Sequence, residues 1–146
     1  MLKKWGKKML ALEMEKSEVK GFMGRLLRED LFDMFEARTV EISAAMKITV
    51  DCDSEWSVSR PTVYEIVKLC TKPKYVKIIF AFINATDIHT NAATLFLNLV
   101  YENGGVTFTT ATAQKEFALD KSLDNEWDTW VRAFFANANI TVTDRE

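Results

Sequence analysis

Several residue types are scarce in this chain of 146 residues, and each shortage excludes a kind of site. With two cysteines, Cys52 and Cys70, and one histidine, His89, the chain lacks the four ligands of a Cys/His zinc site. The cysteines are not spaced as CxxC, so we expect both to be reduced and packed as small apolar side chains. The chain has five glycines and no phosphate-cradling loop, and the dinucleotide-binding, serine-hydrolase and zinc-protease motifs are absent.

Long apolar runs are also missing. The longest, residues 76–83, contains Lys77 and is far shorter than the roughly 20 residues of a membrane span. The apolar run at residues 9–12 ends at Glu13, which is not the pattern of a secretory signal. We therefore expect a cytoplasmic protein that makes no membrane contact.

Neither sign of charge dominates the chain, whose net charge is −2, but the charges are unevenly distributed. Residues 1–8 contain no acidic residue and four lysines, which are Lys3, Lys4, Lys7 and Lys8. We interpret this segment as a flexible basic tail, or as a start upstream of Met9, the first residue that matters to the fold. Four charges at about 1 kcal/mol each are marginal for membrane anchoring. Nucleic-acid binding is not expected except through these lysines.

The residues that are abundant indicate a globular domain. Apolar residues make up 48% of the chain and aromatic residues 12%, which is enough for one hydrophobic core. A chain of this length is typical of one domain that needs no metal or disulfide to fold. We expect a single domain over residues 9–140, with residues 141–146 as a C-terminal tail.

Hydrophobic periodicity predicts the secondary structure. Period-two alternation and β-branched runs predict strands over residues 9–14, 36–42, 46–52, 75–83, 95–101 and 106–111, with a further strand or bulged continuation over 115–119. Helical spacing predicts three helices, with Ser17 and Ser122 as N-caps and Pro61 at a first helical position. Residues 53–60 and 84–93 are predicted loops. The fold class is therefore α+β, a mainly antiparallel sheet of six to seven strands in the order β-α-β-β-α-β-β-β-α.

The last predicted helix carries an apolar stripe of Trp127, Trp130, Val131 and Phe134. We expect all four side chains to be buried against the strand at residues 95–101. The alternative is that this stripe is an exposed face that binds a partner.

Four segments have a familiar sequence: EKSEVKGFMGRLL, FDMFEARTVEI, FLNLVYENG and FALDKSLDNEWDTWV. Together they resemble an uncharacterised family of small bacterial proteins, a domain of unknown function. The resemblance covers residues 9–140 and implies a single cytoplasmic domain, with no activity and no functional residues to carry over. The element order and the hairpin LVYENGGVTFTT also resemble, less closely, a sliding-clamp domain of bacterial DNA replication.

His89 and Asp87 are the candidate catalytic residues. Both lie in a predicted polar loop, where a histidine beside an aspartate suits a general base or a metal ligand. The alternative is an exposed loop histidine without partners, because no nucleophile or orienting group is visible nearby in the sequence.

Two further candidates lie earlier in the chain. Asp51, Asp53 and Glu55 present oxygen atoms at i, i+2 and i+4, a pattern that can suit Ca²⁺ or Mg²⁺ but that lacks the glycine and final glutamate of an EF-hand. Trp56 follows in the predicted loop, where an aromatic side chain is a candidate for binding a partner.

These observations favour a non-catalytic binding or protein-interaction module, whose partner is another protein or a second copy of the chain, with no cofactor. Two alternatives remain open. One is a clamp-like domain associated with DNA transactions, and the other is a hydrolase that uses His89 and Asp87 or a metal at the acidic cluster.

Overall fold

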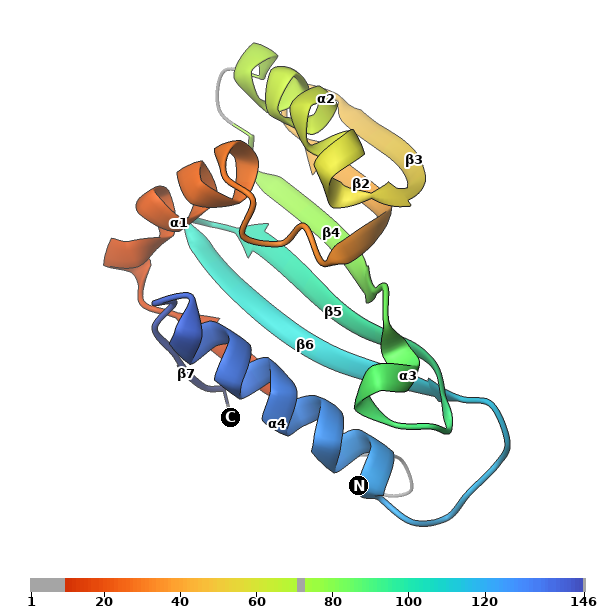
Figure 1. Ribbon diagram of the computed structural model, residues 1–146. Coiled ribbons are helices and arrows are strands. Elements are labelled where there is room, and N and C mark those ends of the chain that lie inside the picture. Colours follow the sequence, from red (N-terminus) through yellow and green to blue (C-terminus); the bar gives the residue numbers. More distant parts are fainter. Residues whose placement is uncertain (1–9, 71–72, 146) are drawn as a thin grey trace.

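The fold is α+β, as the sequence predicts. The computed structural model describes residues 10–70 and 73–145, and Figure 1 shows their arrangement. The elements along the chain are β1 (Ala11–Met14), α1 (Lys16–Arg28), β2 (Phe35–Ser43), β3 (Lys47–Glu55), α2 (Trp56–Leu69), β4 (Tyr75–Phe82), α3 (Ala85–Ile88), β5 (Ala92–Glu102), β6 (Gly105–Gln114), α4 (Ser122–Asn137) and β7 (Val142–Asp144). All of the strands belong to one antiparallel sheet in the order β3-β2-β4-β5-β6-β1-β7.

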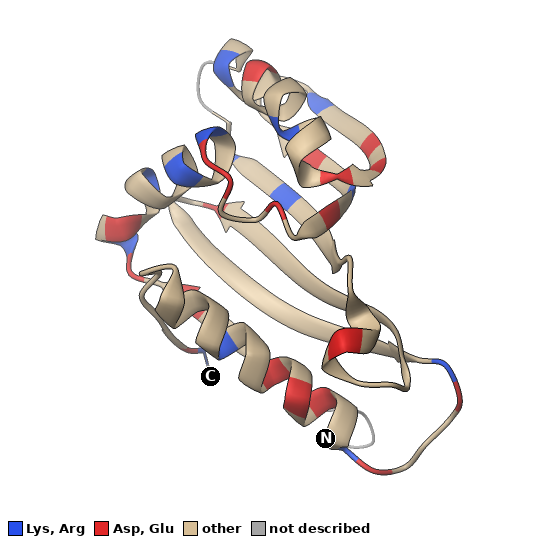
Figure 2. Cartoon of the chain, in the orientation of Figure 1, with Lys and Arg blue, Asp and Glu red and all other residues tan. Residues whose placement is uncertain are grey.

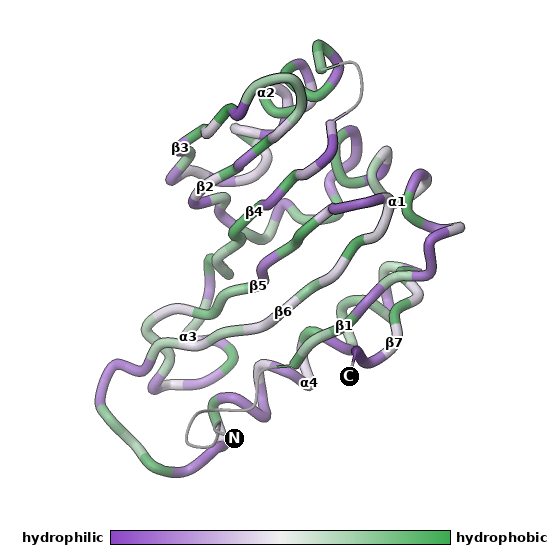
Figure 3. Tube along the Cα trace, turned by 180° about the vertical axis from the view of Figure 1, so that it is seen from behind, coloured by the Kyte–Doolittle hydropathy of each residue, from purple (hydrophilic) through white to green (hydrophobic). Residues whose placement is uncertain are grey.

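The three long helices lie on one face of this sheet (Figure 1). From behind, the strands themselves face the viewer (Figure 3). Strand β5 shows the consequence, because Leu95, Leu97 and Leu99 are fully buried while Phe96 and Asn98 are partly exposed. Alternation along a strand therefore separates a core face from an open face.

A dense group of aromatic rings fills the core beneath the helices. Phe32 stacks on Phe80 with ring centroids 5.0 Å apart, and Trp56 meets Phe80 edge-on at 5.3 Å. Phe108 and Phe135 extend the group toward α4, with centroids 4.6 Å apart. Close-packed rings of this size supply much of the apolar area that the domain buries.

The sheet bends where β2 and β3 pair. Thr39 lies opposite Asp51 and Ala37 opposite Ser54, so β3 carries an extra residue at this point. Asp53 lies inside this bulge with a φ of 44°, a left-handed conformation that aspartate tolerates better than most residues. Exposure nevertheless alternates along the whole of β3, from Lys47 to Glu55.

The segment predicted as a loop at residues 53–60 is instead the end of β3 and the first turn of α2, so this prediction was wrong. The helix begins at Trp56, and Pro61 lies inside it rather than at its start. Pro61 cannot donate a hydrogen bond to the turn before it, which normally argues against a helix interior. Trp56 is completely buried, and its packing holds the first turn of α2 in place.

Smaller differences occur at element ends. Helix α1 begins at Lys16 and α4 at Ser122, so neither Ser17 nor Ser122 is an N-cap, and neither helix has a side-chain cap. One turn of helix, α3, lies within the predicted loop at residues 84–93. Strand β6 ends at Gln114, so residues 115–119 form no strand.

Strand β7 lies in the segment that the sequence assigned to a C-terminal tail. It pairs with β1, with Met14 opposite Val142 and Leu12 opposite Asp144. Three residues are too few for periodicity to reveal a strand, and the partner strand comes from the other end of the sequence. The basic segment at residues 1–8 lies outside the described residues.

Candidate functional site

His89 is held by hydrogen bonds on both ring nitrogens. Its Nδ1 accepts a hydrogen bond from the backbone N–H of Asn91 at 3.0 Å, and its Nε2 lies 3.0 Å from Oγ of Ser122. A neutral ring that accepts at Nδ1 carries its proton on Nε2, so His89 donates to Ser122. Ser122 in turn donates to Oδ1 of Asp120 at 2.5 Å. The prediction that His89 has no partners was therefore wrong.

A histidine, a serine and an aspartate are thus connected, but in the order that opposes nucleophilic catalysis. An activating histidine must accept the serine proton, whereas here the serine hydroxyl donates to Asp120 and the histidine donates to the serine. The hydroxyl and backbone N–H of Ser122 lower the pKa of Asp120, which makes this carboxylate a poor base. The chain of bonds joins the turn before β5 to the start of α4.

The other candidate ligands and acids are not brought together. Asp87 is exposed on α3, and no hydrogen bond or ion pair of the described residues joins it to His89. Asp51, Asp53 and Glu55 are exposed along β3, at the edge of the sheet. Within residues 10–70 and 73–145, no three His, Cys, Asp or Glu side chains lie close enough to hold one metal ion.

Trp56 is a core residue and not a binding residue. Its side chain has no exposed surface, and its Nε1–H donates to the carbonyl oxygen of Leu26 at 3.4 Å. The indole therefore connects α2 to α1. The sequence prediction failed because it placed this residue in a loop.

Both cysteines are free and half-buried, which confirms that no disulfide joins them. Burial raises the pKa of the Cys52 thiol, so this side chain is less reactive than an exposed cysteine. Both residues pack against the hydrophobic core as partly buried side chains, in agreement with the prediction that they serve as small apolar groups.

The apolar stripe of α4 is buried along one side only. Trp127 and Val131 have no exposed surface, but Trp130 and Phe134 are only partly buried, and Phe135 takes the core position predicted for Phe134. The ring of Trp130 stacks between Trp127 and Phe134, at centroid distances of 5.2 and 5.3 Å. Trp127 also donates from Nε1 to the carbonyl oxygen of Phe96 at 2.9 Å.

The most unusual surface feature is the segment between β6 and α4, residues 115–121, which we call the Phe117 loop. Phe117 and Leu119 are each 84% exposed, more than the other large apolar side chains of the described residues except Leu69, which matches them. Two neighbouring large apolar groups held in water are costly, since each would gain free energy on burial. A loop of this kind therefore requires an explanation.

The backbone of the Phe117 loop is fixed by two side-chain amides. Asn91 donates from Nδ2 to the carbonyl oxygen of Glu116 at 2.9 Å and accepts the Glu116 N–H at 3.0 Å. Gln114 does the same for Ala118, donating to its carbonyl oxygen at 3.2 Å and accepting its N–H at 3.0 Å. Each side-chain amide thus makes the pair of backbone hydrogen bonds that a residue of a neighbouring strand would make in a sheet.

These four hydrogen bonds determine where the apolar side chains point. The backbones of Glu116 and Ala118 are held by these bonds, Phe117 lies between the two residues, and Leu119 follows directly after. Phe117 and Leu119 are therefore presented to solvent, each 84% exposed, next to a hydrogen-bonded backbone. The sequence suggested a strand here because FAL alternates like one, but the partner is a pair of amides rather than a strand.

A second feature lies at the opposite end of β6. A hollow of about 380 Å³ opens between α1, α2 and the β5–β6 turn, and we call it the α1–α2 hollow. Its apolar wall consists of Val19, Met23, Leu27, Val67 and Val76. Two exposed lysines, Lys16 and Lys20, also line it, and neither makes an ion pair with any described residue. The volume lies within the roughly 300–1,000 Å³ range of ligand pockets.

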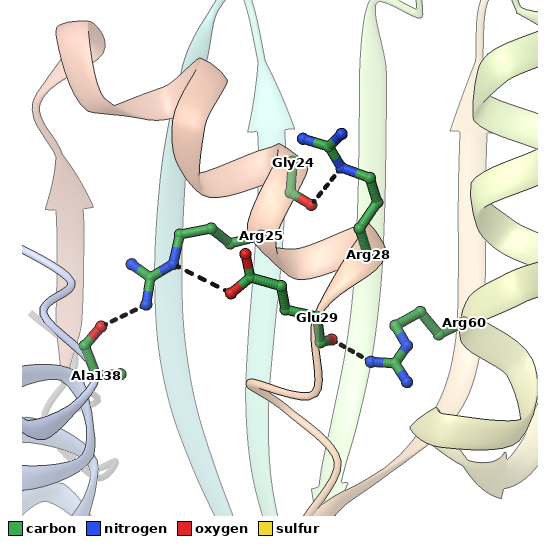
Figure 4. Close-up of polar contacts among 6 residues, drawn as sticks. All are labelled: Gly24, Arg25, Arg28, Glu29, Arg60 and Ala138. Carbon is green, nitrogen blue, oxygen red and sulfur yellow. Dashed lines mark hydrogen bonds and ion pairs between the residues drawn. The ribbon is translucent and has the colours of Figure 1, made fainter.

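The α1 wall of the hollow is held from its C-terminal end (Figure 4). Arg25 donates to the carbonyl oxygen of Ala138 at 2.7 Å and lies 3.8 Å from the Glu29 carboxylate. Arg60 of α2 donates to the carbonyl oxygen of Glu29. These contacts join α1 to α2 and to the end of α4, so the hollow has a fixed wall.

Comparison with known proteins places the chain in a family without assigning an activity. No curated protein and no solved structure matches it, and no helix of the described residues is long and apolar enough to cross a membrane. The resemblance expected over residues 9–140 is confirmed over a narrower range. A family model described as "Family of unknown function (DUF5721)" matches residues 51–143, which is more than half of the chain, and the chain therefore belongs to this family.

Proposed function

We propose that this protein is a non-catalytic protein-interaction module that docks on its partner through the Phe117 loop. The observation that carries the proposal is the clamped backbone, because Asn91 and Gln114 hold Phe117 and Leu119 away from the domain. Interface hot spots are enriched in aromatic side chains that enter a pocket of the partner. Phe117 is a side chain of that kind.

The hydrogen-bonded conformation of the loop should lower the free-energy cost of binding a partner. Binding normally costs free energy to fix the loops and side chains of an interface, and a preorganised segment has already met part of this cost. A loose loop would instead allow Phe117 to turn back onto the domain. The hydrogen bonds of Asn91 and Gln114 prevent this, although they leave the apolar side chains exposed.

The loop itself carries two lysines and two acidic residues, so the charges of the neighbouring helices α3 and α4 decide the balance, and they favour a protein partner over a lipid surface. Acidic residues lie on the first turns of α4 and on α3, as Figure 2 shows. Asp87, Asp124 and Glu126 would repel an anionic membrane. They suit a partner whose apolar pocket is bordered by lysine or arginine.

Photo-crosslinking tests the proposal directly. A photoreactive phenylalanine analogue is placed at position 117, and at Val58 as the control, in cells that naturally produce the protein. Val58 is apolar and 66% exposed on α2, so it matches the chemistry but not the loop. We expect a defined protein adduct from position 117 alone. Equal adducts from both positions, or none from position 117, would contradict the proposal.

The two alternatives from the sequence gain no support of this kind. For the hydrolase, the candidate histidine, His89, is a hydrogen-bond donor to Ser122. For the clamp-like domain, no solved structure matches this chain. Both stay predictions, and so does the cytoplasmic location.

A further inference from the structure

We infer that the partner of the Phe117 loop is a second copy of this chain, which receives Phe117 and Leu119 in its α1–α2 hollow. The inference rests on the proposed function and adds the identity of the partner. It uses two surface features of one molecule, an exposed apolar pair on the loop and an apolar hollow lined by two lysines.

The apolar parts match first. Phe117 and Leu119 are the only large apolar side chains on the loop, and the hollow offers an apolar wall in a volume of about 380 Å³. Val19, Leu27 and Val76 are buried and give this wall a fixed shape. Met23 is partly exposed, and its flexible thioether can adapt to an entering ring.

The charges match as well. Glu116 and Asp120 are the exposed neighbours of the apolar pair, while Lys115 and Lys121 lie one position further out. The charged residues that line the hollow, among those the structure describes, are Lys16 and Lys20. Glu116 and Asp120 lie nearer to the apolar pair than Lys115 and Lys121 do, so an inserted loop brings acidic side chains toward two lysines that make no ion pair with any described residue.

The two features cannot meet within one molecule. The hollow includes Gly104, just before β6, and the Phe117 loop follows directly after β6. Ten residues of strand separate them by about 30 Å, and they lie at opposite ends of the sheet (Figure 1). Contact must therefore be between molecules. It can close as a two-fold dimer, in which the loop of each chain enters the hollow of the other, or continue as a ring or a filament.

Two variants separate the halves of this interface. Phe117→Ser/Leu119→Ser removes the insert, and Lys20→Glu/Met23→Glu closes the hollow to it. Met46→Glu/Lys47→Glu is the control, because it makes the same substitutions on exposed residues of the β2–β3 hairpin, where Lys47 also gives up its ion pair with Glu41. Thermal unfolding first establishes that each variant folds.

Sedimentation velocity of the full chain over a concentration series measures assembly. We expect the wild type and the control to self-associate as dimers or larger assemblies, and each interface variant to associate roughly tenfold more weakly or worse. Mixing the two interface variants in equal amounts should restore a dimer and nothing larger. That mixture contains one intact loop and one intact hollow, and these form a single contact.

Each other outcome overturns the inference. A wild type that stays monomeric, or a mixture that stays monomeric although the wild type assembles, excludes insertion into the hollow. Loss of assembly in the control variant assigns the contact to another surface. If the wild type is monomeric and position 117 still crosslinks to a different protein, self-association fails while the proposed function holds. Vesicles of anionic phospholipid that bind the wild type, but not the loop variant, exclude both.

Discussion

Two groups of apolar residues lie close together in the sequence, but one group is exposed and the other is buried. Phe117 and Leu119 of the Phe117 loop are almost fully exposed, whereas Trp127 and Val131, which follow within α4, are fully buried. In α4, helical spacing places apolar side chains on the side that faces the sheet. In the loop, two side-chain amides hold the backbone so that the apolar side chains face away. Hydrophobicity alone therefore does not distinguish a core residue from a docking residue.

Among the variants that test this contrast, truncation of Trp127 should lower the free energy of unfolding the most. The side chain has no exposed surface and donates a hydrogen bond to Phe96. Trp127→Ala should therefore cost about 3–5 kcal/mol of the free energy of unfolding, out of a total of about 5–15 kcal/mol for a domain. Urea denaturation measures it, with Phe117→Ala as the control. We expect the control to stay within about 0.5 kcal/mol of the wild type, and equal losses in the two variants would contradict the contrast.

Trp130 should be intermediate. Its ring stacks on Trp127 and Phe134 and lies 4.7 Å from Phe82, but part of it faces solvent. Trp130→Ala should therefore lower the unfolding free energy by less than Trp127→Ala, because less apolar area is lost. The same denaturation series gives the ranking. A loss larger than that of Trp127→Ala would show that the partly exposed side of the stripe carries the packing.

Removal of one loop clamp should alter local order more than global stability. Asn91→Ala deletes both hydrogen bonds to Glu116, and Gln114→Ala deletes both to Ala118. Each bond contributes roughly 0.5–1.5 kcal/mol at most. Native-state hydrogen exchange should show a faster Glu116 amide in the first variant and a faster Ala118 amide in the second. Unchanged exchange at both amides would remove the reason for calling the loop preorganised.

The smallest expected effect is the pH dependence that Asp120 contributes. Hydrogen bonds from Ser122 hold the pKa of this carboxyl below its usual range. A lowered folded pKa contributes stability that is present above the unfolded value, about 3.9, and is lost as the pH falls through the folded value.

Denaturant unfolding at about pH 6 and about pH 3 tests this contribution. Asp120→Asn should lose less stability between the two values than the wild type does. Asp87→Asn serves as the control, because Asp87 is an exposed aspartate for which no side-chain hydrogen bond is seen in the described part of the chain. An identical pH dependence in the wild type and in Asp120→Asn would contradict the assignment.

Much of the fold was predictable from local patterns. The alternation of Leu95, Leu97 and Leu99 gave the buried face of β5, and the Asn103-Gly104 pair gave the turn to β6, where both residues have positive φ. The prediction failed for Trp56, because apolar residues alternate in the sequence only as far as Cys52, whereas β3 continues to Glu55 and α2 begins at Trp56. Helix starts were also displaced, since the serines at α1 and α4 do not cap them.

The candidate site was much less predictable. His89 and Ser122 are 33 positions apart, and Asn91 and Glu116 are 25 apart. No sequence period connects residues at such separations, so their hydrogen bonds had no signal in the single sequence. Exposure of Phe117 was hidden for the same reason, because its surroundings depend on Asn91, which lies in the turn before β5.

The sequence by itself determined the three long helices, the first six strands and their order, because these depend on the spacing of apolar residues over a few positions. It did not determine α3 or β7, which are too short for a period to show. The tertiary structure alone decided which apolar side chains remain in water. It brought Asn91 beside Glu116 and placed Gln114 where its amide holds Ala118, and so it turned FAL from a possible strand into a presented loop. The physical reason is that exposure is a property of what packs against a residue, and those neighbours come from distant parts of the chain.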